Sequence, residues 1–201
     1  MPAARESLLE AAFAAVARRP WPAVRMVDVA AAAGVSRQTL YNEFGSKEGL
    51  ARALVRREAD AYLAGVERSL AGGGDAAERL AATAEWTASA ARDNPLLRAL
   101  LTGCWSERLP APPLNAVPST SAVPAQRRAD GPLPSPGELV AQVRDRAVVA
   151  LSAPGTARTD GAELARASEL VVRLALSCIA APPGEGGLTA LVRAVLPRQI
   201  A

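Results

Sequence analysis

Apolar residues recur at three- and four-residue steps through most of this chain, in segments separated by glycine and proline. Leu8, Leu9, Ala12, Phe13 and Val16 form one such stripe, with the spacing of a single helix face. No stretch shows the sustained alternation of β-branched and aromatic residues that is typical of strands. Only 3% of the residues are aromatic, so Ala, Leu and Val must fill the core. Because Ala and Leu favour helices, we predict an all-α fold.

Glycine and proline breaks set the expected helix boundaries, and Ser36, Ser46 and Asp75 stand where side-chain N-caps are expected. The predicted helices cover residues 3–18, 26–33, 36–42, 47–70, 76–92, 96–104, 138–151, 163–179 and 185–196, and Thr159 or Asp160 is expected to start the helix that contains residues 163–179. Eight prolines fall between Leu109 and Gly137, which excludes a helix there and is long for an ordered loop. We interpret residues 106–137 as a Pro-rich flexible loop that acts as a solvated linker. The alternative is a lid or a partner-binding segment.

Residue types that are missing exclude several classes of function. The chain has no histidine, and its two cysteines, Cys104 and Cys178, are far apart, so neither a Cys/His metal site nor a catalytic Ser–His or Cys–His pair can form. We find no Gly-rich phosphate loop and no compact carboxylate pair, so we expect no enzyme and no cofactor. Residues 1–19 lack the features of a signal peptide, and no apolar run approaches the roughly 20 residues that span a bilayer. We expect a soluble, cytoplasmic protein.

The formal net charge is +3 and is unevenly distributed. Residues 1–57 contain nine basic and five acidic side chains, an excess of +4, whereas the remainder carries −1. A basic head on a neutral body favours a nucleic-acid partner. Ordinary scatter explains an excess of this size equally well, so the motif that follows decides the question.

Residues 27–44 have the pattern of a helix-turn-helix, in which two short helices cross steeply around a tight turn. Ala30 and its alanine neighbours allow close approach of the helices, and Gly34 permits the backbone geometry of the turn. Val35 and Leu40 are expected to fill the gap between the helices. Phe44 is expected to close the far end against the helix that begins at Lys47.

The outward face of the second helix then carries side chains that suit a major groove. Arg pairs with guanine and Gln with adenine through two hydrogen bonds, and Thr can contact a thymine methyl group. Hydroxyl and amide groups reach phosphates, as does a cation at a helix N-terminus. The predicted DNA-binding residues are Ser36, Arg37, Gln38, Thr39, Tyr41, Asn42 and Lys47. Alternatively, Arg37 or Gln38 is solvated and contacts no base, and Tyr41 packs on Lys47.

This motif strongly resembles the TetR (tetracycline-repressor-like) family of transcriptional regulators over residues 5–57. The residues that carry the resemblance are Val29-Ala30, Ala33-Gly34-Val35-Ser36, Thr39-Leu40-Tyr41-Asn42, Phe44, Ser46-Lys47-Glu48 and Leu50. The resemblance implies nine or so helices, with a three-helix DNA-binding head and a larger C-terminal body. It also implies that Arg37, Gln38 and Thr39 read bases while Tyr41, Asn42 and Lys47 hold phosphates.

Two positions depart from the family pattern. Arg25 stands where members usually place a threonine that caps the second helix and contacts phosphate, so that cap is missing or supplied differently. The usual Gly-rich link after the first helix is replaced by residues 19–22, Arg-Pro-Trp-Pro, which leaves the shape of this link open.

We expect a helix-turn-helix DNA-binding domain over residues 1–46 and a helical ligand-binding and dimerisation domain over residues 47–201. One recognition helix contacts too few bases to select an operator, so we expect a homodimer on a palindromic site. The last two helices are the candidates for its interface, where the family also places one, although both could be buried within one subunit. The candidate interface residues are Leu170, Val171, Leu174, Cys178, Leu188, Leu191, Val192 and Val195.

The family resemblance also implies a small-molecule pocket in the body, with mostly apolar walls. The candidate ligand-binding residues are Trp86, Thr87, Ala90, Leu97, Leu101 and Trp105, although the two tryptophans could be plain core residues. The expected function is a sequence-specific regulator of double-stranded DNA, a repressor released from its operator by a small hydrophobic or lipid-like ligand. The alternative is a DNA-binding protein of the same fold whose body binds a partner protein and no inducer. A tightly filled body would favour that alternative.

Overall fold

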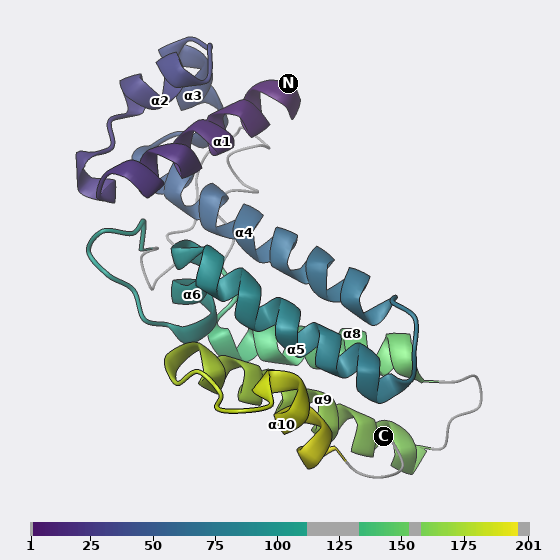
Figure 1. Ribbon diagram of the computed structural model, residues 1–201. Helices are drawn as coiled ribbons and strands as arrows, with labels where there is room; N and C mark the ends of the chain where they lie inside the picture. Colours follow the sequence, from purple (N-terminus) through teal and green to yellow (C-terminus); the bar gives the residue numbers. More distant parts are fainter. Residues whose placement is uncertain (1, 112–132, 153–157, 197–201) are drawn as a thin grey trace. The chain divides into compact units, whose positions relative to one another are not determined.

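The structure is a computed structural model that describes residues 2–111, 133–152 and 158–196. These residues form nine α-helices, one short 3₁₀-helix and no strand, which confirms the all-α prediction (Figure 1). Residues 112–132, most of the predicted Pro-rich loop, lie outside the described part. The chain divides into two compact units, unit 1 (Met1–Glu58 with Cys104–Leu133) and unit 2 (Ala59–Gly103 with Pro134–Ala201).

Unit 1 is built around three short helices and the start of a long one. Its elements are α1 (Pro2–Arg18), the 3₁₀-helix η1 (Trp21–Ala23), α2 (Met26–Ala32), α3 (Arg37–Phe44) and the first part of α4 (Lys47–Leu70). Helix α1 packs on α2 and α3, and α2 packs on α3. The apolar stripe predicted for α1 supplies Leu8 to this core, where Leu40 and Leu54 are also fully buried.

Unit 2 contains the rest of α4 and five further helices in its described part. These are α5 (Ala76–Asp93), α6 (Pro95–Thr102), α8 (Pro136–Leu151), α9 (Arg158–Ala180) and α10 (Gly187–Val195). Helix α9 packs against α5, α8 and α10, and α10 also packs against α5. Helix α9 is therefore the central helix of this unit.

Side-chain caps explain several of the helix boundaries. Asp75 and Glu78 form a reciprocal capping box at the start of α5, and Ser135 and Glu138 form another at the start of α8. Because Ser135 caps and Pro136 suits a first helical turn, α8 begins two residues earlier than predicted. At its C-terminus, α6 ends before Gly103, whose φ of +72° lies in the left-handed region.

A small buried polar cluster joins α4 and α5 within unit 2. The Tyr62 hydroxyl lies 3.1 Å from Thr87 Oγ1, and Thr87 donates to the Thr83 carbonyl at 2.8 Å. Burial raises the pKa of Tyr62 to about 12. Trp86 Nε1 donates to the Tyr62 carbonyl at 3.2 Å, and its ring lies against Gly65, where a Cβ would collide with it. Gly65 therefore lets the Trp86 ring approach the α4 backbone closely.

Candidate nucleic-acid interface

The turn between α2 and α3 has the geometry that the sequence predicts for a helix-turn-helix. Gly34 has a φ of +68°, a conformation that side chains with a Cβ disfavour, while a Cβ there would have open space around it. The Val35 amide donates to the Ala30 carbonyl at 3.0 Å, which closes the turn. Ala30 and Leu40 are buried between the helices. The positive φ of Gly34 and the small side chain of Ala30 together allow the tight turn.

Ser36 caps α3, as predicted. Its Oγ accepts a hydrogen bond from the Thr39 amide at 3.0 Å and lies 2.9 Å from Thr39 Oγ1. The two hydroxyls are thus held together at the N-terminus of α3. Ser36 is exposed and Thr39 is half-buried.

The solvent-facing side of α3 carries four of the predicted DNA-binding residues in two pairs. Gln38 Nε2 donates to Asn42 Oδ1 at 2.8 Å, which fixes the orientation of the Gln38 amide. The Arg37 guanidinium lies 5.5 Å from the centre of the Tyr41 ring, a cation–π contact that restrains Arg37. Arg37, Gln38 and Asn42 are exposed, so these groups can meet a ligand without rearrangement of the core.

Lys47, the seventh predicted residue, is held by the connection between α1 and α2. Its Nζ donates to the Pro22 carbonyl at 3.1 Å and lies 5.2 Å from the centre of the Trp21 ring. The Trp21 amide in turn donates to the Arg108 carbonyl at 2.8 Å. Sequence reasoning missed Trp21 and Pro22 as partners of Lys47, because only the folded link brings them beside the start of α4.

The first turn of α2 is held by an ion pair in place of a side-chain cap. Arg25 occupies the N-cap position and makes no capping hydrogen bond. Instead, Arg25 donates to both oxygens of Asp28, at 3.0 and 2.8 Å, and Arg19 adds a third bond at 3.2 Å. The hydrogen bond from Arg25, followed by the charges of both arginines, lowers the pKa of Asp28. The missing threonine is thus replaced by a different interaction.

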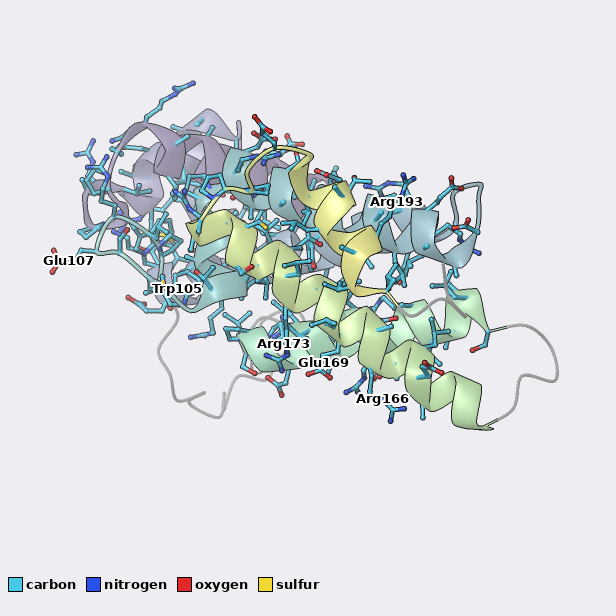
Figure 2. The ribbon with its side chains drawn as sticks, turned by 60° about the horizontal axis from the view of Figure 1, so that its bottom comes forward. Trp105, Glu107, Arg166, Glu169, Arg173 and Arg193 are labelled. Carbon is cyan, nitrogen blue, oxygen red and sulfur yellow. The ribbon has the colours of Figure 1, made fainter. Side chains whose placement is uncertain are left out.

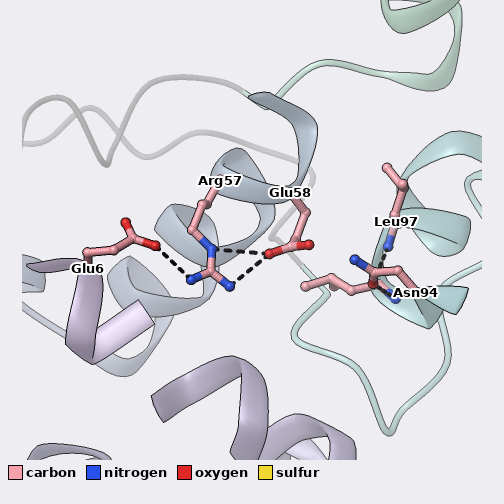
Figure 3. A network of polar contacts seen from close by, with 6 residues as sticks. Glu6, Arg57, Glu58, Asn94 and Leu97 are labelled. Carbon is pink, nitrogen blue, oxygen red and sulfur yellow. Dashed lines mark hydrogen bonds and ion pairs between the residues drawn. The ribbon is translucent and has the colours of Figure 1, made fainter. Parts of the chain in front are cut away.

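Some basic residues of unit 1 are neutralised inside the unit. Arg57 binds Glu6 at 3.0 Å and Glu58 at 2.9 Å (Figure 3). Arg5 lies 4.7 Å from the centre of the Phe44 ring and 3.6 Å from Glu43. The excess of +4 already counts Glu6 and Glu43, so these ion pairs leave the net charge unchanged and show only which basic side chains face a carboxylate.

The predicted ligand-binding residues of unit 2 are mostly part of its packed interior. Thr87, Leu97 and Leu101 are buried, whereas Trp86 and Ala90 are half-buried. Trp105 is half-buried and belongs to unit 1. Their role in ligand binding stays a prediction.

A groove of about 510 Å³ opens elsewhere in unit 2, between α4, α5 and α8. Its lining is mainly apolar and includes Leu70, Ala71 and Val149, of which Val149 is 82% exposed. Four charged residues also line it: Glu67, Arg79, Asp145 and Arg146. None of the six predicted ligand-binding residues lies in this lining.

The predicted interface residues fall into two groups. Leu170, Leu191 and Val195 are exposed and Leu174 is half-buried, so they can meet a second molecule. The others are buried in their own unit: Val171, Cys178, Leu188 and Val192. Figure 2 shows Arg166, Glu169 and Arg173 projecting from α9, where Arg173 binds Glu169 at 2.7 Å. The exposed side of α9 thus carries both apolar and charged side chains.

Neither a metal site nor a membrane span emerges from the described ranges. No three His, Cys, Asp or Glu side chains converge there as metal ligands. No helix in these ranges is long and apolar enough to cross a bilayer. What remains is the polar face of α3 on a tight two-helix turn, and this geometry defines a DNA-binding protein of the helix-turn-helix class.

Comparison with known proteins identifies the family. Residues 8–54 match the model of the bacterial regulatory proteins of the tetR family. The HTH-type transcriptional regulator AlkX of Mycobacterium tuberculosis is 36% identical over 181 residues, which cover 89% of this chain and 76% of that protein. The chain belongs to the TetR family of transcriptional regulators, which bind DNA.

Solved structures agree with this fold. The TetR family repressor AlkX from Dietzia sp. strain DQ12-45-1b matches with a TM-score of 0.55 and 23% identity, over 98% of this chain and 97% of that one. A TetR/AcrR regulator from Thermobifida fusca matches with a TM-score of 0.56 and 19% identity, over 94% and 92%. At these identities the structures establish the shared fold alone.

Proposed function

We propose that this protein is a homodimeric repressor that binds a palindromic operator and is released by a small hydrophobic compound. Residues 1–46 bind the DNA, and residues 47–201 carry the dimer interface and the effector site. The observation that carries the proposal is the exposed face of α3, where Arg37 and Gln38 are oriented by neighbours on the same helix. The protein would act in the cytoplasm, where bacterial DNA lies.

On this face, Arg37, Gln38 and Thr39 read base edges, and Ser36, Tyr41 and Asn42 hold phosphates together with Lys47 at the start of α4. Side chains that are already oriented lose less conformational freedom on binding, which favours affinity. The bond from Gln38 Nε2 to Asn42 leaves the Gln38 Oε1 as an acceptor and the second Nε2 hydrogen as a donor. This combination matches the edge of adenine in the major groove.

Genome-wide footprinting with the purified protein tests the sequence-specific part of the proposal. It should recover a palindrome with half-sites about one helical turn apart. On that operator, Arg37→Ala and Gln38→Ala should each cost about 1–3 kcal/mol and relax selectivity at one base pair per half-site. Arg98→Ala, which removes the same charge from the exposed side of α6, is the matched control. Recovery of no palindrome would contradict sequence-specific binding.

Acetylation of the single lysine tests the phosphate role of Lys47. Because the ammonium becomes neutral, binding should weaken, and the slope of log K against log salt should become shallower by about 0.9. Titration of a labelled operator at several salt concentrations measures both quantities. Equal slopes before and after acetylation would show that Lys47 contacts no phosphate.

The exposed apolar residues of α9 and α10 are the proposed dimer interface. Leu170→Glu and Leu191→Glu should place a charge in that interface and give a monomer that binds the operator weakly. Light scattering after size exclusion gives the mass. Val149→Glu makes the same change at an exposed site on α8 and should leave the dimer intact. A dimer that survives both substitutions would place the interface elsewhere.

The groove between α4, α5 and α8 supports an effector, since its lining is mainly apolar. The Dietzia AlkX is described as implicated in biodegradation of n-alkanes, so n-alkanes of graded chain length are the first compounds to test for release from the operator. Ala71→Trp should fill the groove and abolish the response while DNA binding persists. Ala82→Trp, exposed on α5 and outside the groove lining, is the control. A complex that no compound releases would favour a body that binds a partner protein.

A further inference from the structure

The two groups that directly contact the Lys47 ammonium are uncharged, and the adjacent Glu48 carboxylate interacts with it through charge alone. The Pro22 carbonyl accepts one of its hydrogen bonds at 3.1 Å, and the Trp21 ring presents its face at 5.2 Å. By contrast, Arg57 and Arg25 are bound to carboxylates, at 3.0 and 2.8 Å. Neutral partners orient a cation without cancelling its charge, and a lysine ammonium has three donors, so hydrogen-bond donors and positive charge stay available for an anion.

The backbone of Trp21 is itself fixed in unit 1. Residues Trp21–Ala23 form the 3₁₀-helix, in which the Val24 amide donates to the Trp21 carbonyl at 3.0 Å. The Trp21 amide donates to the Arg108 carbonyl at 2.8 Å. The backbone of Trp21 is therefore held on both sides, and its half-buried ring faces the lysine.

We propose that Trp21 is a positioning residue of the DNA interface, which holds the Lys47 ammonium in the place where it meets a backbone phosphate. The inference rests on the phosphate role proposed above for Lys47. A free lysine side chain has four rotatable bonds that binding must fix, and the ring and the Pro22 carbonyl fix them before DNA arrives. Trp21 thus acts through Lys47 and reads no base.

A double-mutant cycle on the full-length protein tests this inference. Affinity for a labelled duplex and its salt slope are measured for Trp21→Leu, Lys47→Ala and the double variant. A random-sequence duplex is sufficient, since phosphate contacts are independent of sequence. Trp21→Leu should weaken binding about three- to tenfold in the wild-type background and less than about twofold beside Lys47→Ala. Trp21→Phe keeps an aromatic face and should restore most of the affinity.

Other outcomes overturn the inference in distinguishable ways. Equal weakening by Trp21→Leu in both backgrounds would show that Trp21 only supports the fold. Tighter binding would show that the ring and the phosphate compete for the ammonium. If Lys47→Ala alone leaves affinity and salt slope unchanged, the phosphate role of Lys47 fails as well. Trp105→Leu, at the other tryptophan of unit 1, is the matched control, and thermal melts verify that each variant is folded.

Discussion

The Ser36 hydroxyl has two partners at the start of α3, the backbone amide and the hydroxyl of Thr39. The first satisfies one of the amides that a helix N-terminus leaves without an internal partner. The second keeps the Thr39 side chain beside it. One short side chain thus both stabilises the recognition helix and orders a neighbouring predicted DNA contact.

Ser36→Ala should lower the free energy of unfolding by about 1 kcal/mol, because the Thr39 amide loses its acceptor. Urea denaturation followed by circular dichroism measures the change. Ser36→Asp keeps an acceptor at the cap and should retain most of the stability. Equal losses in the two variants would show that capping is not the reason for the effect.

Sequence reasoning works well for residues whose partners are close along the chain. The cap at Ser36 and the turn at Gly34 depend on neighbours within a few positions, and both predictions are confirmed. The partners of Lys47 and the replacement of the α2 cap by Arg25 and Asp28 were not predicted. The first depends on the path of an irregular link between helices, and the second on the side-chain conformation of an exposed arginine.

At the scale of elements, the contact between α4 and α5 depends on a glycine, Gly65, which has no side chain. The Trp86 ring occupies the space that a Cβ at Gly65 would fill. Glycine in a helix interior costs about 1 kcal/mol relative to alanine. In this position the cost is offset by a large aromatic contact and by the hydrogen bond from Trp86 to Tyr62.

Gly65→Ala should therefore destabilise unit 2 by about 1–2 kcal/mol, despite the better helix propensity of alanine, because the Trp86 ring must move. Thermal or urea denaturation measures the loss. Gly161→Ala in α9 places a Cβ in open space and should be neutral or stabilising by up to about 1 kcal/mol. A stabilising Gly65→Ala would mean that the ring shifts without cost.

Helix positions were predicted to within a few residues, because glycine, proline and capping residues mark them locally. For example, α9 begins at Arg158, next to the expected start at Thr159 or Asp160. Side-chain burial on α9 and α10 was harder to predict. Val171 and Leu170 are adjacent, yet the first is buried and the second is 47% exposed. This difference is set by the helices against which α9 packs.

At the scale of the whole molecule, the distribution of titratable groups sets the response to pH. The chain has no histidine, the side chain that ordinarily changes charge between pH 5 and 8. Hydrogen bonds from Arg25 lower the pKa of Asp28, and those from Arg173 lower the pKa of Glu169. The backbone amide of Ser135 lowers the pKa of Glu138 in the same way.

A carboxyl whose pKa is lower in the folded state stabilises the fold above its unfolded pKa and loses this effect as the pH falls through the folded value. The melting temperature should therefore be nearly constant from about pH 5.5 to about pH 8 and should fall below about pH 4. Melts across this range check the expectation. Asp28→Asn should make the acid-induced decrease shallower, whereas a decrease between pH 7 and pH 6 would contradict the assignment.

Which residues belong to each of the two units could not be derived from local patterns. Residues Cys104–Ala111 belong to unit 1, although they follow α6 of unit 2 directly in the chain. The hydrogen bond between Trp21 and Arg108 joins residues far apart in sequence, and neither residue type indicates such a pairing. The motif over residues 27–44 identified the DNA-binding element because its partners are local, whereas the body carries no comparable motif.

Lys47 provides the only side-chain amine in this chain. Any reagent that attaches proteins to sensor surfaces through amines therefore reacts with Lys47, in the proposed DNA interface, or with the α-amino group of the chain. Molecules attached through Lys47 would be folded and yet bind an operator weakly or not at all. Attachment of the DNA, with the protein in solution, avoids a false negative result in the first experiment that most laboratories would perform.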